Sequence, residues 1–311
     1  MLENHPSLVV VGSHAPGIAV RVKRIPVPGE TAIGWDLNEP QDGGKGSNQA
    51  IAAARLGLST SFVGCIGNDR LGEDCERVLR AEGVDTRYLY HSDSKPTGAG
   101  IILLDEDGVP AMVTVAGAND ELDFQQVAAA LEGLSGARVL LTQFEIQPEV
   151  ALQSAHLAHR YNMTAIVNPA PAAPVNLDEL GVADILVPNE VEAKMLLGID
   201  PGAPIEPENA AKRLRERTNA EVVVVTAGEQ GLAGADSQGT WRALPPSVSV
   251  VDTSGAGDVF CAAMAAGLIR GMDHRTASQW ACIAASLSVT KEGTIPSFPA
   301  AAEVNGSIGN R

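Results

Sequence analysis

The sequence predicts an α/β protein with a doubly wound, mostly parallel sheet, helices on both faces, and a small separate β-sheet that forms a lid. Continuous apolar runs that alternate with helical patterns support the large sheet, because parallel strands are buried on both faces. Four segments in which apolar and polar residues alternate support the small sheet, because each of its strands has a solvated side. The 311 residues, 45% of them hydrophobic, allow a full core.

The buried strands are expected where apolar, mostly β-branched runs end in a polar or glycine-containing turn. The first is Leu8–Val11, which leads into Gly12-Ser13-His14. Others are expected at residues 61–63, 138–141, 164–167, 184–187, 221–225 and 247–251. Ligands of open α/β sheets bind at the carboxyl ends of the strands. That rule collects four polar residues on one rim of the sheet, namely Glu145, Asn168, Asn189 and Thr226.

Helical patterns fill most of the segments between these strands. They are expected at residues 47–56, 72–82, 123–131, 148–161, 190–197, 206–218 and 256–270. Gly57 is expected to close the first of these helices. The end of the chain, from about Ala300, is rich in glycine, asparagine and serine and is expected to fray.

The four alternating segments are expected to form the lid, at residues 17–23, 31–37, 98–104 and 110–116. Residues 105–108 (DEDG) are typical of a hairpin turn between the last two. The expected division is a main domain of residues 1–13, 42–96 and 118–311, and a lid of residues 14–41 and 97–117. The apolar side of the lid needs cover, and a second copy of the lid would supply it, so a homodimer is expected.

Charge and composition restrict the partners and the location of the protein. The net charge is −16, from 22 basic and 38 acidic residues, which would repel a phosphate backbone and argues against nucleic acid as a partner. The apolar run near the N-terminus is too short for a signal peptide or a membrane span. Without a C-x-x-C pair, the cysteines are interpreted as small buried residues of a reducing cytoplasm: Cys65, Cys75, Cys261 and Cys282.

The stretch VDTSGAGDVF, residues 251–260, places two glycines and two aspartates in a turn before a small-residue helix. Free N–H groups at a helix start attract an anion, and glycines let it come close. Asp258 falls in the first turn of this helix. In one interpretation it is an ordinary first-turn acidic residue. In the other, the N–H groups hold a phosphoryl group during transfer, and Asp258 accepts the proton of the attacking hydroxyl.

A second glycine-rich stretch, GGKGSNQA at residues 43–50, also runs into a helix. It is either a loop that merely opens the helix or a site where Lys45 and Asn48 bind hydroxyl groups. It is not a Walker A loop, because G-x-x-x-x-G-K-[ST] occurs nowhere in the chain. A dinucleotide fingerprint does not follow the first strand either, because the spacing from Gly12 to Gly17 is wrong.

Together these motifs make the chain resemble the PfkB family of ribokinase-like carbohydrate kinases, and its ribokinase branch most of all. The resemblance runs from about Leu8 to Pro299 and is carried chiefly by the two glycine-rich stretches. Shorter matches lie at residues 28–31 (PGET), 116–119 (AGAN), 168–171 (NPAP), 188–190 (PNE), 291–293 (KEG) and 296–297 (PS). It implies an ATP-dependent kinase that transfers the γ-phosphate to a hydroxyl of a small sugar.

The resemblance also implies residue roles at the sugar and at the transferred phosphoryl group. Asp258 corresponds to the catalytic base that deprotonates the sugar hydroxyl. The backbone N–H groups of Gly255, Ala256 and Gly257 correspond to the anion hole. Sugar contacts are implied at Gly44, Lys45, Asn48 and Glu145.

Further roles concern the nucleotide and the metal ions. Asn189 and Glu192 match an N-x-x-E motif that helps to hold Mg²⁺ and the phosphates. Residues 226–231 resemble the nucleotide-binding turn, with Thr226, Gly228 and Gly231 as contacts, and Cys282 falls near the adenine. A monovalent-cation site, best suited to K⁺, is implied at Asp252, Ser254, Ser288, Lys291, Gly293 and Ser297.

One departure from the family concerns the sugar end of the site. Ribose binders carry an Asn and an Asp in a G-S-x-N-x-D pattern, where this sequence has Ala15 and Gly17. His14 is either a strand-end residue at the lid hinge or a substitute sugar contact. Since one matched polar contact can be worth orders of magnitude in selectivity, ribose is the first candidate, and another pentose, a deoxypentose, a ketohexose or a nucleoside stays open. A non-catalytic sugar or nucleoside sensor on the same scaffold is the alternative.

Overall fold

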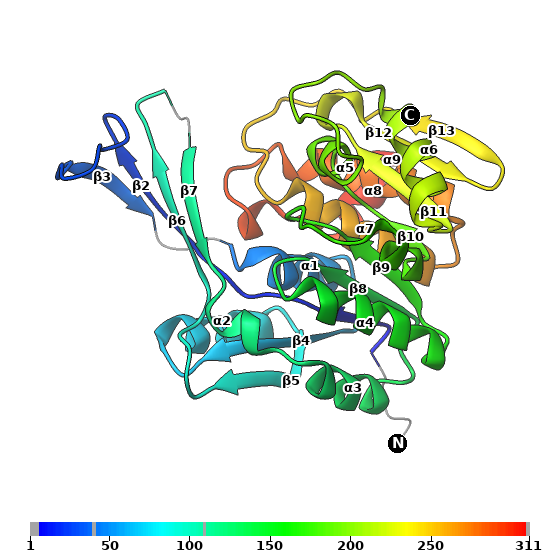
Figure 1. Cartoon of the computed structure of the whole chain (residues 1–311), viewed down its shortest axis with the longest axis horizontal. Coiled ribbons are helices and arrows are strands. Elements are labelled where there is room, and N and C mark those ends of the chain that lie inside the picture. Colours follow the sequence, from blue (N-terminus) through cyan, green and yellow to red (C-terminus); the bar gives the residue numbers. More distant parts are fainter. Residues whose placement is uncertain (1–5, 39–41, 108–109, 309–311) are drawn as a thin grey trace.

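The computed structural model describes residues 6–38, 42–107 and 110–308, and in this part nine strands form one sheet (Figure 1). They are β1 (Leu8–Val11), β4 (Thr60–Gly67), β5 (Asp85–Ser92), β8 (Val139–Gln143), β9 (Thr164–Asn168), β10 (Ile185–Leu186), β11 (Val222–Thr226), β12 (Leu232–Asp236) and β13 (Gly239–Ala243). Their order is β13-β12-β11-β10-β9-β8-β1-β4-β5. The sheet is parallel except for β12 and β13, which turn back as an antiparallel edge.

Strand β1 lies inside the sheet and pairs in parallel with β4 on one side and β8 on the other. From β1 the chain moves to β4 and β5, and it then returns to β8 and continues in the opposite direction. The winding therefore reverses between β1 and β8. Open α/β sheets bind their ligands at the carboxyl ends of strands at such a reversal. Here those ends are Val11 and Gln143.

Helices cover both faces of this sheet. They are α1 (Gly44–Arg55), α2 (Arg70–Ala81), α3 (Phe124–Gly133), α4 (Pro148–Ala158), α5 (Glu190–Leu196), α6 (Pro207–Thr218), α7 (Ala256–Ile269), α8 (His274–Ser288) and α9 (Ala301–Ile308). Short 3-10 helices lie at Gly117–Glu121, His159–Tyr161, Leu177–Val182, Gly228–Gln230 and Ile295–Ser297.

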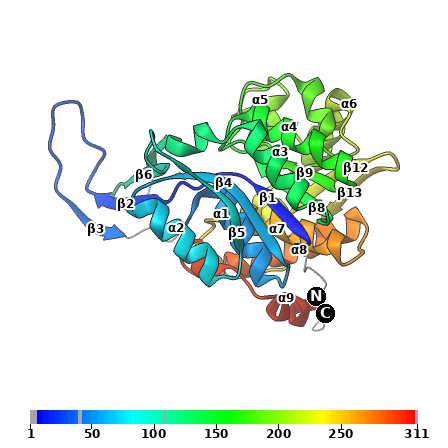
Figure 2. The same ribbon diagram turned by 90° about the horizontal axis from the view of Figure 1, so that it is seen from below.

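The core is split by the sheet into two apolar layers. Leu8 and Val10 of β1 pack with α1, α7 and α8, whereas Val9 and Val11 pack with α3, α4 and α6. This alternation follows from the period of two along a strand. Figure 2 shows α3, α4 and α6 on one side of the sheet and α7, α8 and α9 on the other. The predicted fold class is confirmed.

A separate four-stranded sheet projects from one side of the main body (Figures 1 and 2). Its strands are β2 (Gly17–Val22), β3 (Gly34–Asn38), β6 (Ala99–Leu104) and β7 (Pro110–Val115), in the order β3-β2-β6-β7. Strands β6 and β7 pair antiparallel, as a hairpin requires, although Gly108 of the expected turn lies outside the described residues. Apolar side chains stay exposed on this sheet, among them Leu37, Met112 and Val113.

Two expected features are wrong. The strand expected at residues 247–251 is an irregular segment, because Pro245 and Pro246 break strand pairing just before it, and Val250 stays half exposed. The chain end does not fray from Ala300 but forms α9, whose Val304 is fully buried in the core. A hydrophobic anchor of this kind stabilises a short helix that composition alone would not predict.

Other predictions fare better. Gly57 follows α1 with a φ of 85°, as a helix-closing glycine should. All four cysteines are buried, as expected. None of the helices in the described part of the chain has both the length and the apolar character that a membrane span requires.

Candidate active site

The rim at the carboxyl ends of the strands carries the polar residues that the sequence placed there. Gln143 at the end of β8 is in register with Asn168 at the end of β9. Asn189 pairs with Thr226, the last residue of β11, in an isolated parallel β-bridge. The Asn168 side chain donates a hydrogen bond to the Val187 carbonyl, 2.8 Å away. The rim is therefore a polar edge that extends from β8, where the winding reverses, to β11.

Asp258 lies in the first turn of α7 and is buried against the start of α1. The Asn48 amide donates to one carboxylate oxygen at 3.1 Å, and the Gln49 amide donates to the other at 3.0 Å. Burial raises the pKa of Asp258, against the opposing effects of the Lys45 ammonium and the two amides. The two donors fix the direction of the carboxylate, and its burial strengthens it as a proton acceptor.

Gln49 belongs to a chain of amides that ends at Asp258. The Gln143 side-chain amide donates to Gln49 Oε1 at 2.6 Å, and Gln49 Nε2 also donates to Asn168 Oδ1 at 3.2 Å. Gly12 makes room for this chain, because a Cβ there would lie 2.1 Å from Gln143 Oε1. The sequence reading did not assign a role to Gln49 or Gln143, since only the tertiary fold brings them together.

Glu145, two residues after β8, links the glycine-rich start of α1 to the end of that strand. One carboxylate oxygen accepts hydrogen bonds from the Ser13 hydroxyl at 2.6 Å and from the Lys45 backbone N–H at 2.8 Å. Burial opposes the charge of Lys45, but Asp258, Glu145 and Glu192 together outweigh it and raise the pKa of the ammonium. The structure thus brings Lys45, Glu145 and Asp258 into one electrostatic cluster.

Gly44 permits this close packing. Its φ is 75°, and a Cβ there would lie 2.7 Å from the Ala15 backbone nitrogen. His14 contacts the same helix start through Ser47. Its ring is buried, with Nδ1 2.9 Å from Ser47 Oγ. Burial lowers the pKa of His14 to about 4, although Asp69 and Asp74 act the other way.

The start of α7 has open space beside Gly257. Gly255 precedes the helix with a φ of 75°, and a Cβ there would collide with Thr294 and Phe298. A Cβ at Gly257 would have nothing within 4 Å. The Ala256 N–H makes only a long contact, 3.3 Å, with the Thr253 carbonyl. In the described part of the chain, the Gly255 and Gly257 amides have no backbone acceptor, so the predicted anion hole is open to a ligand.

A cavity of about 720 Å³ adjoins this helix start. Its lining includes seven of the residues predicted for the nucleotide and the anion hole: Asn189, Thr226, Gly228, Gly231, Ala256, Gly257 and Cys282. The irregular segment from Leu244 to Val250 forms another wall and was not predicted. The volume suits a ligand of nucleotide size.

Glu192 is joined to Asn189, which lines this cavity, in a reciprocal cap of α5. The Asn189 N–H donates to the Glu192 carboxylate, and the Glu192 N–H donates to Asn189 Oδ1, both at 2.8 Å. Burial is the main cause that raises the pKa of Glu192. The predicted N-x-x-E pair is therefore brought together, with its carboxylate in the same field as Lys45.

The residues predicted for a monovalent cation meet beside the α7 turn. Asp252 accepts hydrogen bonds from the N–H groups of Ser254 and Gly293, each at 2.9 Å. The Ser288 carbonyl accepts the Lys291 N–H at 3.3 Å, whereas the Lys291 ammonium points to the exposed Glu303 carboxylate, 2.9 Å away. Ser297 is buried and donates to the Thr294 carbonyl. Side-chain ligation by Lys291 is thus not supported, which leaves carbonyl oxygens and the other side chains of this loop as the candidate ligands.

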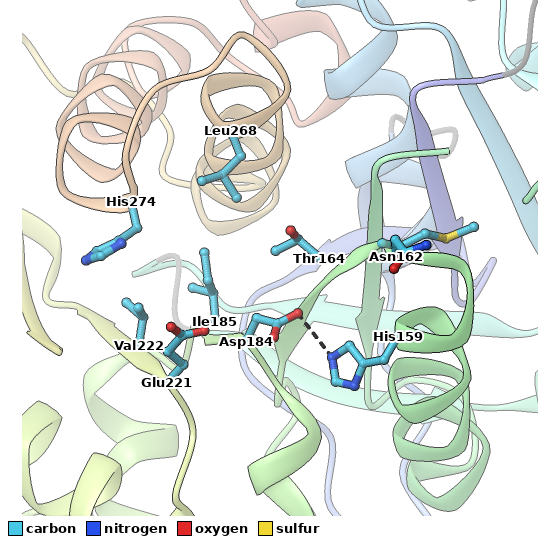
Figure 3. A pocket seen from close by; sticks show the side chains of 10 residues that line it. His159, Asn162, Thr164, Asp184, Ile185, Glu221, Val222, Leu268 and His274 are labelled. Carbon is cyan, nitrogen blue, oxygen red and sulfur yellow. Dashed lines mark hydrogen bonds and ion pairs between the residues drawn. The ribbon is translucent and has the colours of Figure 1, made fainter. Parts of the chain in front are cut away.

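A second cavity, of about 450 Å³, lies at the other edge of the sheet, where β9, β10 and β11 begin (Figure 3). His159 and Asp184 face each other there, 3.1 Å apart. None of the predicted site residues lines it. The chemistry expected from the sequence is therefore concentrated at the carboxyl edge.

Comparison with known proteins accounts for this arrangement. The family described as pfkB family carbohydrate kinase matches residues 21–301. The chain belongs to this family. As a member of the pfkB family it is a phosphotransferase that acts on a sugar hydroxyl.

Individual pfkB relatives are similar over nearly the whole chain. The ribokinase of Bacillus subtilis is 36% identical over 300 residues, which cover 96% of this chain and 98% of that protein. The solved ribokinase of Thermotoga maritima has a TM-score of 0.88 and 33% identity, over 98% of this chain and 100% of that one. The Arabidopsis thaliana ribokinase solved with ribose and ATP has a TM-score of 0.86 and 31% identity, over 97% and 98%.

Proposed function

We propose that this protein is an ATP-dependent sugar kinase that transfers the γ-phosphate of ATP to a hydroxyl of a small sugar, with ribose as the first candidate. One observation carries the proposal. At the start of α7, Gly257 lines the nucleotide-sized cavity, and the next residue, Asp258, is hydrogen-bonded to Asn48 in the first turns of α1. A kinase needs its base and its anion hole between its two substrates.

Asp258 would act as the general base. Its raised pKa strengthens it as a proton acceptor, and the Asn48 and Gln49 amides fix its direction. The N–H groups of Gly255, Ala256 and Gly257 would hold the charge that develops on the phosphoryl group. Positioning and electrostatics of this kind account for most of the catalysis of phosphoryl transfer.

The sugar would lie between the α7 turn and the start of α1. Gly44, Lys45, Asn48 and Glu145 would bind its hydroxyl groups. Lys45 supplies donors and Glu145 supplies acceptors, and each has a buried partner that keeps it in place. His14 stays a candidate contact, although its ring is held by Ser47. The lid, proposed as residues 14–41 and 97–117, would close over the sugar and limit hydrolysis of ATP.

ATP would occupy the 720 Å³ cavity, with its adenine near Cys282. The Arabidopsis thaliana ribokinase was solved with ribose and ATP, which supports this pair of substrates. Asn189 and Glu192 would hold Mg²⁺, and the fit is reasonable because a buried carboxylate and an amide oxygen are hard oxygen ligands. When bound, Mg²⁺ neutralises phosphate charge. K⁺ would bind carbonyl or side-chain oxygens of one loop, with Lys291 contributing its carbonyl, at Asp252, Ser254, Ser288, Lys291, Gly293 and Ser297.

The lid would also join two copies into a homodimer. Leu37 is 73% exposed and Val113 64% exposed, which is unusual for large apolar residues on a sheet. Sedimentation velocity tests this, and a Val113→Lys variant should shift the protein towards monomer. A cytoplasmic location is consistent with the four buried cysteine thiols.

A coupled ADP-release assay tests the function, with ribose, deoxyribose, fructose, other pentoses and nucleosides, each with and without K⁺. We expect ADP release with at least one sugar and stimulation by K⁺. The sensor alternative is favoured by Ala15 and Gly17, which leave fewer polar sugar contacts. Sugar binding without any ADP release would establish the sensor and refute the kinase.

A further inference from the structure

The lid end of the sugar site lacks polar side chains at two places, Ala15 and Gly17, but a carboxylate stands there. Asp42, just before the glycine-rich start of α1, accepts a hydrogen bond from the Gly17 N–H at 2.5 Å. A Cβ built on Gly17 would lie 3.2 Å from one Asp42 carboxylate oxygen and 3.4 Å from the other. The Asp42 carboxylate therefore occupies the space into which a side chain at position 17 would extend.

The surroundings of Asp42 are those of the sugar site. Burial raises the pKa of Asp42, the Gly17 N–H opposes this, Glu145 adds to the rise and Lys45 counters it. Glu145 and Lys45 also act on Asp258. Asp42 is thus coupled to the same two groups as Asp258, and these groups link the lid end of the site to the end where the proton is removed.

A carboxylate has about four acceptor positions, and on Asp42 the Gly17 N–H and the Asp42 N–H take two of them. A partly buried carboxylate with spare acceptor positions is costly unless donors reach it. Two neighbouring hydroxyl groups of a sugar supply two donors at the right spacing. A charged acceptor also makes the stronger kind of hydrogen bond.

We infer that Asp42 is a specificity-determining sugar contact, whose carboxylate accepts hydrogen bonds from neighbouring hydroxyls away from the one phosphorylated and replaces a side chain absent at Gly17. The inference rests on the proposed sugar kinase function. It selects a sugar with a vicinal diol at the lid end and disfavours the corresponding deoxy sugar.

The first test is Asp42→Asn, which keeps the size of the side chain and an oxygen for the Gly17 N–H. We expect the KM for the sugar to rise about 10- to 100-fold, with the KM for ATP and the melting temperature nearly unchanged. Asp178→Asn, at an exposed position, is the matched control and should match the wild type. A sugar KM within about twofold of the wild type for Asp42→Asn would overturn the inference.

Deoxy sugars separate direct contact from a general change of charge. Wild type and Asp42→Asn are compared on ribose, 2-deoxyribose and 3-deoxyribose. If Asp42 binds a hydroxyl, the effect of the substitution shrinks on the sugar that lacks it. An equal effect on all three sugars would mean that Asp42 acts only through the field or the fold, and would overturn the contact.

A swap of the carboxylate tests the geometry. Gly17→Asp alone should weaken sugar binding, because its side chain would crowd Asp42. Gly17→Asp combined with Asp42→Ala should restore the sugar KM to within about tenfold of the wild type. If the double variant is no better than Asp42→Ala alone, and both unfold at the wild-type temperature, the two positions do not share one space and the inference fails.

The failure of the inference is distinguishable from that of the proposed function. Sugar turnover by the wild type together with an unaffected Asp42→Asn keeps the kinase and rejects Asp42. If the wild type releases no ADP, the melting-temperature shift caused by ribose is measured instead. A shift that Asp42→Asn abolishes keeps Asp42 as a sugar contact on a non-catalytic protein, and a shift that it retains rejects it.

Discussion

Helices α1 and α7 each start at a glycine with a φ of 75°, Gly44 as the first residue of α1 and Gly255 just before α7, yet their first turns differ in what occupies them. In α1 the Lys45 N–H is already taken by the Glu145 carboxylate at 2.8 Å. In α7 the space next to Gly257 is empty within 4 Å. One helix start is neutralised by the protein itself, and the other is left open.

This difference assigns a substrate to each helix. A helix start attracts anions, so a start that already holds a carboxylate should prefer a neutral polyol, which binds to fixed donors and acceptors. The open start should take the transferring phosphoryl group. Asp258 belongs to the open helix but is held by Asn48 and Gln49 of the neutralised one. The base thus stands where the two substrates would meet.

The largest effect is expected from Asp258→Asn, which removes the base and keeps the shape. Turnover should fall about 10²- to 10⁴-fold, because the sugar hydroxyl keeps its proton. Coupled ADP release gives the rate, and calorimetry with ATP should give an unchanged affinity. Near-normal turnover in a folded variant would show that α7 supplies only the anion hole.

Acid should lower the free energy of unfolding through His14, which is buried against Ser47 of α1. Its pKa in the folded protein is about 4, below the ordinary value of 6.5, so the unfolded chain binds the proton more readily. Its contribution to the free energy of unfolding is complete above pH 6.5 and is lost as the pH falls towards 4, by about 3 kcal/mol in total. Urea unfolding across this range measures it.

His14→Gln should flatten that pH dependence relative to the wild type. His156→Gln, at an exposed helix position, is the matched control and should leave it unchanged. Comparing variants in this way cancels the carboxylates, whose pKa values also shift on folding. Parallel curves for the wild type and His14→Gln would contradict the prediction.

Glu145→Gln should make the start of α1 more like that of α7, because it removes the negative charge that neutralises the α1 start. The value of kcat/KM for the sugar should fall about 10- to 100-fold, because the variant loses a charged acceptor, while the KM for ATP stays within about twofold. Inorganic phosphate should become a stronger inhibitor, competitive with the sugar. Glu149→Gln, which is exposed, is the control. Unchanged inhibition by phosphate would refute the assignment of substrates to helices.

The smallest effect is expected at Gly257, for which Gly44 at the start of α1 is the comparison. Gly257→Ala should leave the free energy of unfolding unchanged or raise it by up to about 1 kcal/mol, since the new methyl meets only open space, and yet it should lower turnover. Gly44→Ala should lower the free energy of unfolding by about 1–2 kcal/mol. Thermal unfolding and ADP release measure both. The opposite order of stabilities would contradict the comparison.

Local signals predicted much of this protein. The strand runs and the turn before α7 define the sheet and place Asp258, because both depend on neighbours in the sequence. The amide chain from Gln143 through Gln49 could not be predicted, since it joins residues 94 positions apart. The segment 247–251 misled because strand propensity does not reveal the absence of a pairing partner. Asp42 belongs to no motif, and only its contact with Gly17 in the folded chain indicates a role for it.

The close approach of Gly12 to Gln143 has an evolutionary consequence. A methyl group at position 12 would stand 2.1 Å from the Gln143 side-chain oxygen. Among homologous sequences the two positions should covary, so that a larger residue at 12 occurs only where 143 is shortened. Such a lineage would lose the amide that steadies Gln49, and the orientation of its base would have to be secured by another group.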